Sequence, residues 1–395
     1  MSNMKIKTNN LFFYVGYLSI LFSFMFSKVY IISKGYKTFQ NVAIVLLTLN
    51  ILIQSKKYTR KQFMIIYLLT IVLFISYYFT KSNALILVWL LITSSKNIKI
   101  KEFCKYDLIF RTLFLCIVVC LYFMGFTENY FMYRNNGMLR SSMGLSHPND
   151  FGAYMMILCL EYFYIKQKKL KLLDYSFLLL SLLLMRHFSD SRTSEICIIL
   201  FFTILIFNKV SKYKLFENKN FQFIIKYIFI ILFLLILGMS LLYKNNSRIA
   251  IIANNVFSNR IRLSSYTLEN YKVKLFGNNI KFVTTKEALL TGKKAFILDN
   301  SYMHILMVYG VIVFIVFAYA SYLLNKKMLI EKQYLLLSIF IVLYFYGFNE
   351  TGLFKIQFNS FLICFSYILY NKKFDKENNS ILSSKSIERD NENGI

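Results

Sequence analysis

The chain has 395 residues, of which 57% are hydrophobic and 17% are charged. Soluble domains carry about a quarter charged residues, so this composition excludes an ordinary soluble protein. The formal net charge is +28, but the lysines lie in short loops between apolar runs instead of forming one basic face. That placement argues against nucleic acid as a partner and is typical of a polytopic membrane protein.

The apolar runs predict transmembrane helices along the whole chain. Each is close to the roughly 17 to 25 residues that a helix needs to cross a bilayer. We therefore expect an all-α, polytopic transmembrane helix bundle of about twelve spans. The expected spans are approximately 10–27, 38–54, 62–80, 82–95, 107–126, 149–166, 172–188, 192–208, 221–243, 301–324, 334–350 and 354–371.

The basic loops predict how this bundle is oriented. They recur in every second connection, at 56–61, 96–105, 166–171, 209–219 and 326–332. The positive-inside rule makes these loops and both termini cytoplasmic. Residues 1–371 then form the membrane domain, and residues 372–395 a polar, disordered cytoplasmic tail. The long segment 244–300 becomes a large extracytoplasmic loop, in which we expect a small folded cap or interfacial helices.

The stretch RSSMGLSHPND, residues 140–150, contains the only proline of the chain and the first of several outward-facing polar residues. Pro148 suits the first turn of a helix, and Ser146 or His147 could cap it. The helix N-terminus then favours an anion, and the planar guanidinium of Arg140 matches phosphate oxygens. The alternative is an ordinary cap with an arginine that extends to the membrane surface.

The turn HFSDSRTSEI provides a second outward cation. Arg192 and Glu195 begin the next helix three residues apart, and ionisable residues at membrane depth usually pair or line a cavity. The alternative is a simple ion pair between these two side chains. The long loop adds Arg260 and Arg262 on the same side of the membrane.

The run DNSYMHILMVYG, residues 299–310, places a histidine where the long loop ends. Asn300 and His304 are four residues apart, and Asp299 and Tyr302 are three apart, so the pairs lie on neighbouring helix stripes. A histidine held by a nearby acid or amide can take a proton from a sugar hydroxyl. The alternative is a helix cap with a satisfied histidine.

These motifs together resemble those of the Wzy-type oligosaccharide repeat-unit polymerases, which belong with the O-antigen ligase-like membrane proteins. The resemblance rests on RSSMGLSHPNDFG, SDSRTSEICIIL, SNRIRL followed by FGNN, and DNSYMHILMVYGVIVF, in this order and on one side of the membrane. It covers about residues 105 to 350.

The resemblance implies a GT-C-like fold and a metal-independent, inverting glycosyltransferase without a cofactor. Such an enzyme would join undecaprenyl-diphosphate-linked oligosaccharide units on the outer face of a bacterial cytoplasmic membrane, surrounded by membrane lipid. A flippase and a chain-length regulator are further candidate partners. The expected catalytic residues are His304, Asp299 and His147. The expected substrate-binding residues are Arg140, Asn149, Arg192, Arg260, Arg262, Asn300 and Tyr302.

Three other functions stay open on the sequence. A ligase would transfer finished glycan to another acceptor, but there we expect a histidine–asparagine start to the helix after the loop, where this chain has Asp299 and Asn300. A flippase or other transporter should show internal repeats and charged or broken helices near the midplane. A structural scaffold would not need arginine, histidine and aspartate at four points on one face.

Overall fold

The computed structural model describes residues 10–129, 131–133, 137–166, 172–211 and 213–375. Within these ranges the only sheet is a hairpin of β1 (Phe131–Tyr133) and β2 (Leu139–Ser141), in which Met132 lies opposite Arg140. Six helices of the described chain are long and apolar enough to cross a membrane. They are α3 (Tyr36–Ser55), α4 (Arg60–Thr80), α6 (Ile100–Phe123), α9 (Arg192–Val210), α11 (Lys219–Lys244) and α16 (Val311–Ile330). The expectation of an all-α membrane protein is thus confirmed.

The remaining helices are shorter or less apolar. They are α1 (Leu11–Met25), α2 (Tyr30–Ser33), α5 (Ala84–Ser94), α7 (Pro148–Lys166), α8 (Leu172–Leu184), α10 (Lys214–Glu217), α12 (Arg248–Val256), α13 (Arg260–Asn270), α14 (Thr285–Thr291), α15 (Ser301–His304), α17 (Tyr334–Asn349) and α18 (Phe365–Leu369). The predicted loop 244–300 therefore contains α12, α13 and α14. Most of the predicted tail, from residue 376 onward, lies outside the described residues.

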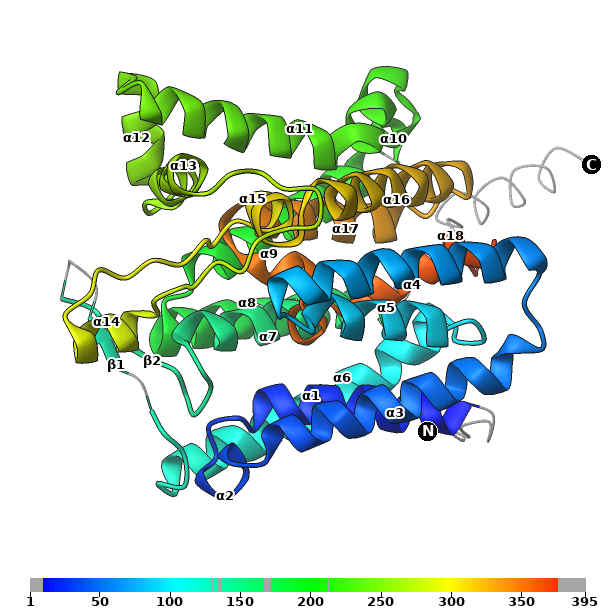
Figure 1. Ribbon diagram of the computed structural model, residues 1–395, viewed down its shortest axis with the longest axis horizontal. Coiled ribbons are helices and arrows are strands. Elements are labelled where there is room, and N and C mark those ends of the chain that lie inside the picture. Colours follow the sequence, from blue (N-terminus) through cyan, green and yellow to red (C-terminus); the bar gives the residue numbers. More distant parts are fainter. Residues whose placement is uncertain (1–9, 130, 134–136, 167–171, 212, 376–395) are drawn as a thin grey trace, which may run out of the picture.

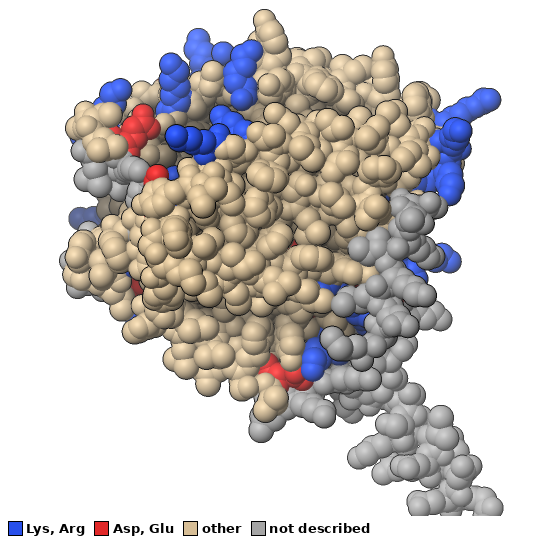
Figure 2. Space-filling view, turned by 90° about the horizontal axis from the view of Figure 1, so that it is seen from below, with Lys and Arg blue, Asp and Glu red and all other residues tan. Residues whose placement is uncertain are grey.

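The long helices run along the longest axis of the molecule (Figure 1). The β1–β2 hairpin, α12, α13 and α14 lie at one end of the bundle, which we call the cap end. The α3–α4 connection, α10 and α18 lie toward the other end, which we call the lysine end because it carries Lys57, Lys61 and Lys96. On the face in Figure 2, lysine and arginine lie mostly toward the two ends, and the broad middle is largely uncharged.

Burial separates the central helices from the peripheral ones. Residues 151–160 of α7 and 334–344 of α17 are all buried, whereas α4 buries only Ser76 and Thr80. These helices are apolar on every side, so their sequences do not distinguish the protein core from the lipid-facing surface. Since α7 and α17 are the buried helices, the polar residues at their ends lie in the interior of the bundle and not on its lipid-facing side.

The predicted helix 301–324 is not continuous, which corrects the sequence analysis. After α15 the chain forms a π-helical turn, Ile305–Tyr309, and α16 starts only after Gly310. Gly310 has a φ of +94°, and a Cβ atom there would lie 2.4 Å from the backbone nitrogen of Gly277, whose own φ is +95°. Both glycines are needed because two backbone segments touch at this point.

The loop segment 272–278 satisfies the backbone of this interrupted helix. The carbonyl of Lys274 accepts from the Val311 N–H at 3.1 Å, and that of Leu275 accepts from the Ile312 N–H at 3.2 Å. The side chain of Asn278 donates to the Met307 carbonyl at 2.9 Å. A helix break inside a bundle needs such replacement hydrogen-bond partners. Segment 272–278 is therefore required for the fold.

The predicted span 354–371 is also irregular. It consists of three 3-10 segments, Thr351–Phe354, Ile356–Phe358 and Ser360–Cys364, followed by the short helix α18. The side chain of Asn359 donates to the Leu353 carbonyl at 2.9 Å and so competes with regular helical bonding. This irregular segment carries polar side chains back into the bundle.

A buried ion pair lies between α6 and α7, within a predicted span. Nη2 of Arg111 lies 2.8 Å from Oδ2 of Asp107, and both side chains are 0% exposed. Arg111 also donates to the Tyr17 hydroxyl at 2.9 Å, and the carboxylate of Glu161 is fully buried nearby. The unusual polar residues were expected only at the outer helix ends, and this interior charge is an addition to them.

Candidate functional site

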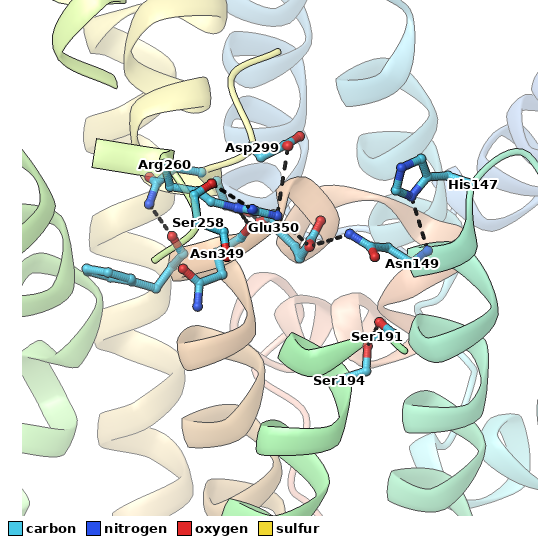
Figure 3. Close-up of polar contacts among 12 residues, drawn as sticks. His147, Asn149, Ser191, Ser194, Ser258, Arg260, Asp299, Asn349 and Glu350 are labelled. Carbon is cyan, nitrogen blue, oxygen red and sulfur yellow. Dashed lines mark hydrogen bonds and ion pairs between the residues drawn. The ribbon is translucent and has the colours of Figure 1, made fainter. Parts of the chain in front are cut away.

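The carboxylate of Glu350 joins three distant parts of the chain at the cap end. Glu350 directly follows α17, and its Oε1 accepts from Nδ2 of Asn149 at 2.8 Å and from Nη2 of Arg260 at 3.2 Å (Figure 3). Asn149 lies in the first turn of α7, and Arg260 begins α13. Two predicted substrate-binding residues therefore share one carboxylate that the sequence analysis did not select.

Arg260 ties the long loop to the end of α17. Its Nε donates to the Asn349 carbonyl at 3.1 Å and its Nη1 to the Ser258 carbonyl at 3.1 Å. Its Nη2 also lies 4.0 Å from Oδ2 of Asp299, and the side chain is only 15% exposed. A largely buried guanidinium with this many partners is held in a fixed orientation.

Arg140 extends the same arrangement toward the β hairpin. Its Nε donates to the Ser189 carbonyl at 2.7 Å, and its Nη2 donates to Oδ1 of Asn149. The Asn149 amide thus accepts from an arginine and donates to Glu350, which fixes its orientation. We call the connected set of Arg140, Asn149, Glu350, Arg260 and Asp299 the cap-end network.

Burial raises the pKa of two carboxyl groups in this network. Burial, with Asp299 and Asp150 nearby, raises the pKa of Glu350 to about 7, although Arg260 and Lys355 oppose the shift. Burial also raises the pKa of Asp299. Glu350 therefore exchanges its proton near neutral pH, as residues of functional sites often do.

Lys355 is a second residue that the sequence analysis missed. It lies between the first two 3-10 segments, is half-buried, and has its ammonium 6.0 Å from the centre of the Phe358 ring. Its charge acts on His147, Asp299 and Glu350. No carboxylate of the described residues comes within 4.0 Å of its nitrogen. Lys355 thus adds a cation beside the network.

The two predicted histidine bases differ in which ring nitrogen carries the proton. Nδ1 of His304 lies 3.4 Å from the Leu298 carbonyl, which can only accept, so Nδ1 carries the proton and Nε2 has the free lone pair. Nδ1 of His147 instead accepts from the Asn149 N–H at 3.1 Å, which leaves the proton on Nε2. Only His304 presents a free proton acceptor. The group that orients the His304 ring is the Leu298 carbonyl and not the side chain of Asp299 or Asn300.

His147 is held neutral. Burial, followed by the charges of Arg140, Arg260 and Lys355, lowers its pKa to about 4. Its Nε2–H is consequently a neutral hydrogen-bond donor at physiological pH.

Asn300 and Tyr302 are buried and bonded to protein groups, so their expected contact with substrate stays a prediction. Asn300 is 0% exposed, and its side chain accepts from the Met303 N–H at 2.9 Å and donates to the Phe348 carbonyl. Tyr302 is also 0% exposed, and its hydroxyl donates to the Tyr344 carbonyl at 2.8 Å. Both side chains thus stabilise the backbone where α15 begins and where it packs on α17.

Arg192 and Arg262 lie outside the cap-end network. Both are exposed; the Nε of Arg192 is 3.8 Å from Oδ2 of Asp190, and the backbone N–H of Arg262 donates to Oδ1 of Asn254. The expected alternative, an Arg192–Glu195 pair, is not formed either. Arg186 contacts both carboxylates, at 2.6 Å to Asp190 and 3.6 Å to Glu195.

The missed residues had a recognisable signal. Glu350 and Lys355 belong to the run YGFNETGLFK, where polar residues interrupt two apolar runs on the predicted outward side. The same criterion selected Arg140 and Asn149. Glu350 is the last residue of the predicted span 334–350 and therefore does not stand out by this criterion.

Comparisons with family models, curated proteins and solved structures find no match for this chain. The fold itself defines the class, an all-α membrane protein with a polar network at one end of the helix bundle. Among the described residues there is no group of three or more histidine, cysteine, aspartate or glutamate side chains that could hold a metal ion.

Proposed function

We propose that the protein is a polysaccharide polymerase of the Wzy type, with about twelve membrane crossings in a GT-C-like arrangement and both termini cytoplasmic. It would join undecaprenyl-diphosphate-linked oligosaccharide units on the outer face of a bacterial cytoplasmic membrane. The observation that supports this most directly is the cap-end network, in which Arg260 donates to the Glu350 carboxylate directly and Arg140 is linked to it through the Asn149 amide. A lipid-linked diphosphate presents its charge at the membrane surface, where such cations are useful.

The proposed reaction assigns separate tasks to cations and base. Nε2 of His304 takes the proton of an acceptor hydroxyl, whose oxygen attacks the anomeric carbon of the growing chain. The bond from that carbon to the diphosphate oxygen breaks, with inversion, and the lipid diphosphate leaves. Arg140, Arg260 and Lys355 stabilise the negative charge that develops on the leaving group.

Before substrate binds, the carboxylate of Glu350 accepts a hydrogen bond from Arg260. The two groups are 3.2 Å apart, so a diphosphate must displace or share that contact. The raised pKa of Glu350, about 7, lowers the cost of this exchange because the carboxyl group can be protonated near neutral pH. In the proposed mechanism, the Glu350 carboxylate thus binds Arg260 in place of the substrate diphosphate until substrate arrives.

The proposal is tested in the native host. The gene is deleted and complemented at matched protein levels with the wild type, Arg260→Ala, His304→Ala or the control Arg262→Ala. We expect the first two variants to lose long chains while single lipid-linked units accumulate on the outer side, and the control to retain long chains. Long chains that remain on the lipid would indicate a ligase, and normal polysaccharide in the Arg260 and His304 variants would refute the proposal.

A transporter for lipid-linked oligosaccharide is the second candidate. The buried Arg111–Asp107 pair, the buried Glu161 and the interrupted segments around Gly310 and 350–364 favour it, because transporters use interior charges and broken helices. In the same strains, accumulation of lipid-linked units on the cytoplasmic side would support the transporter over the polymerase.

A further inference from the structure

An apolar groove runs between four helices of the bundle and shares no lining residue with the cap-end network. It is lined by α4, α5, α16 and α18 and has a volume of about 770 Å³. This is within the range of roughly 300–1,000 Å³ that is usual for ligand sites. Along most of its length the wall consists of aliphatic and aromatic side chains such as Leu69, Val88 and Phe317.

One wall of the groove is α4, a helix of which only Ser76 and Thr80 are buried. The Trp89 side chain of α5 also lines the groove, and its Nε1 donates to Oγ1 of Thr70 in α4 at 2.8 Å. The outward residues Phe63, Tyr67 and Phe74 of α4 are each more than half exposed. Water gains few partners in an apolar groove of this kind, so a hydrocarbon chain is the favoured occupant.

The groove ends among cations at the lysine end. Lys61 and Gln62 belong to its wall, and Nζ of Lys96 donates to Oε1 of Gln62 at 3.4 Å. The Lys96 ammonium also lies 4.6 Å from the ring centre of Tyr58. Of the carboxylates that the structure describes, none lies within 4.0 Å of Lys61 or Lys96. Burial and the charge of Lys57 lower the pKa of Lys96, so an anion placed here would relieve repulsion.

We propose that this groove binds one anionic phospholipid. The phosphate contacts Lys61 and Lys96, and an acyl chain lies between α4 and α16. Basic residues beside a hydrophobic crevice between membrane helices match this chemistry, because they neutralise the headgroup while the crevice takes the chain. The site is separate from the cap-end network and does not depend on the proposed reaction.

Lipid binding to the purified full-length protein tests the charge part of this proposal. The protein in detergent is titrated with phosphatidylglycerol or phosphatidylcholine, and bound lipid is counted by native mass spectrometry. We expect one tightly held phosphatidylglycerol, and a roughly 25-fold loss of its affinity in Lys61→Gln/Lys96→Gln, since each cation contributes about a factor of five. The control Lys209→Gln/Lys219→Gln removes two exposed lysines of other helices and should bind like the wild type.

A second variant tests the position of the acyl chain. Ala320→Phe places a ring in the groove from α16 and leaves every lysine unchanged, so phosphatidylglycerol should be lost although the net charge is the same. Equal phosphatidylglycerol binding by the wild type and Lys61→Gln/Lys96→Gln would overturn the proposal. Retained binding in a monodisperse Ala320→Phe protein would also overturn it. If Ala320→Phe does not fold, the lysine variants and their control still decide.

Discussion

The two ends of the helix bundle both carry cations but hold them in different ways. At the cap end, Arg140 and Arg260 are largely buried and are hydrogen-bonded to residues distant in sequence. At the lysine end, Lys57 and Lys61 are exposed, and neither has a carboxylate within 4.0 Å among the described residues. Exposed lysines can orient a chain in the membrane, whereas buried arginines cost desolvation energy and need a structural or chemical reason.

The largest expected effect concerns the base at the cap end. His304→Ala should lower the rate of glycosyl transfer by about 10²–10⁴-fold, which is the usual contribution of general base catalysis. His147→Ala should have a much smaller effect, because its Nδ1 already accepts a hydrogen bond and its Nε2 carries the proton. Rates measured with purified variants and lipid-linked units compare the two; a larger loss for His147→Ala would reverse the assignment.

A smaller effect is expected from the glycine contact that supports the cap end. Gly310→Ala should lower the free energy of unfolding by about 1–3 kcal/mol, the cost of a strained backbone conformation, and the close approach to Gly277 adds to this. Gly35→Ala is the control, because a Cβ atom there meets nothing within 4 Å. Thermal unfolding in detergent measures both variants, and equal midpoints would show that the contact does not support the fold.

Glu350 should make stability depend on pH. Its folded-state pKa, about 7, lies above its ordinary value of 4.5, so the folded protein binds more protons between these two values. Stability from this group is therefore fully present below pH 4.5 and is lost as the pH rises through about 7. Glu350→Gln should flatten that part of the stability profile, as followed by thermal unfolding from pH 4 to 8. An unchanged profile would contradict the raised pKa.

The smallest effect is expected at the lysine end. Lys96→Gln should change the transfer rate less than twofold while it weakens phosphatidylglycerol binding, because the hydrogen-bond partners of the Lys96 ammonium, the Lys57 carbonyl and Gln62, lie outside the cap-end network. The transfer assay and the lipid titration separate the two results. A large loss of transfer would show that the two ends are coupled.

Much of the architecture could be predicted because bilayer crossing imposes length and apolarity. The predicted spans 38–54, 62–80 and 192–208 agree with α3, α4 and α9 to within two residues at each end. The break at Gly310 could not be predicted in this way, since ILMVYG is apolar throughout and the break depends on contact with Gly277. Hydropathy likewise concealed Asp107 and Arg111, because two charges barely change the average of a long apolar run.

The candidate site was predicted in part for a related reason. Arg140 and Asn149 stand out as polar residues before an apolar run, Arg260 stands out as a cation of the long outward loop, and the structure brings the three together. Asn300 and Tyr302 were equally conspicuous, but their side chains satisfy backbone groups that only the folded chain reveals. Sequence position indicates which side chains are unusual, whereas their partners depend on tertiary packing.

The most direct test of the cap-end network is glycosyl transfer by purified protein in lipid vesicles supplied with lipid-linked repeat units. Arg260→Ala should reduce polymer formation about 10²–10³-fold, the usual effect of losing a group that stabilises developing negative charge. Arg262→Ala, on the same helix but exposed, should retain the wild-type rate. Equal rates for all three proteins, or no polymer from the wild type while intact units cross the membrane, would contradict the account.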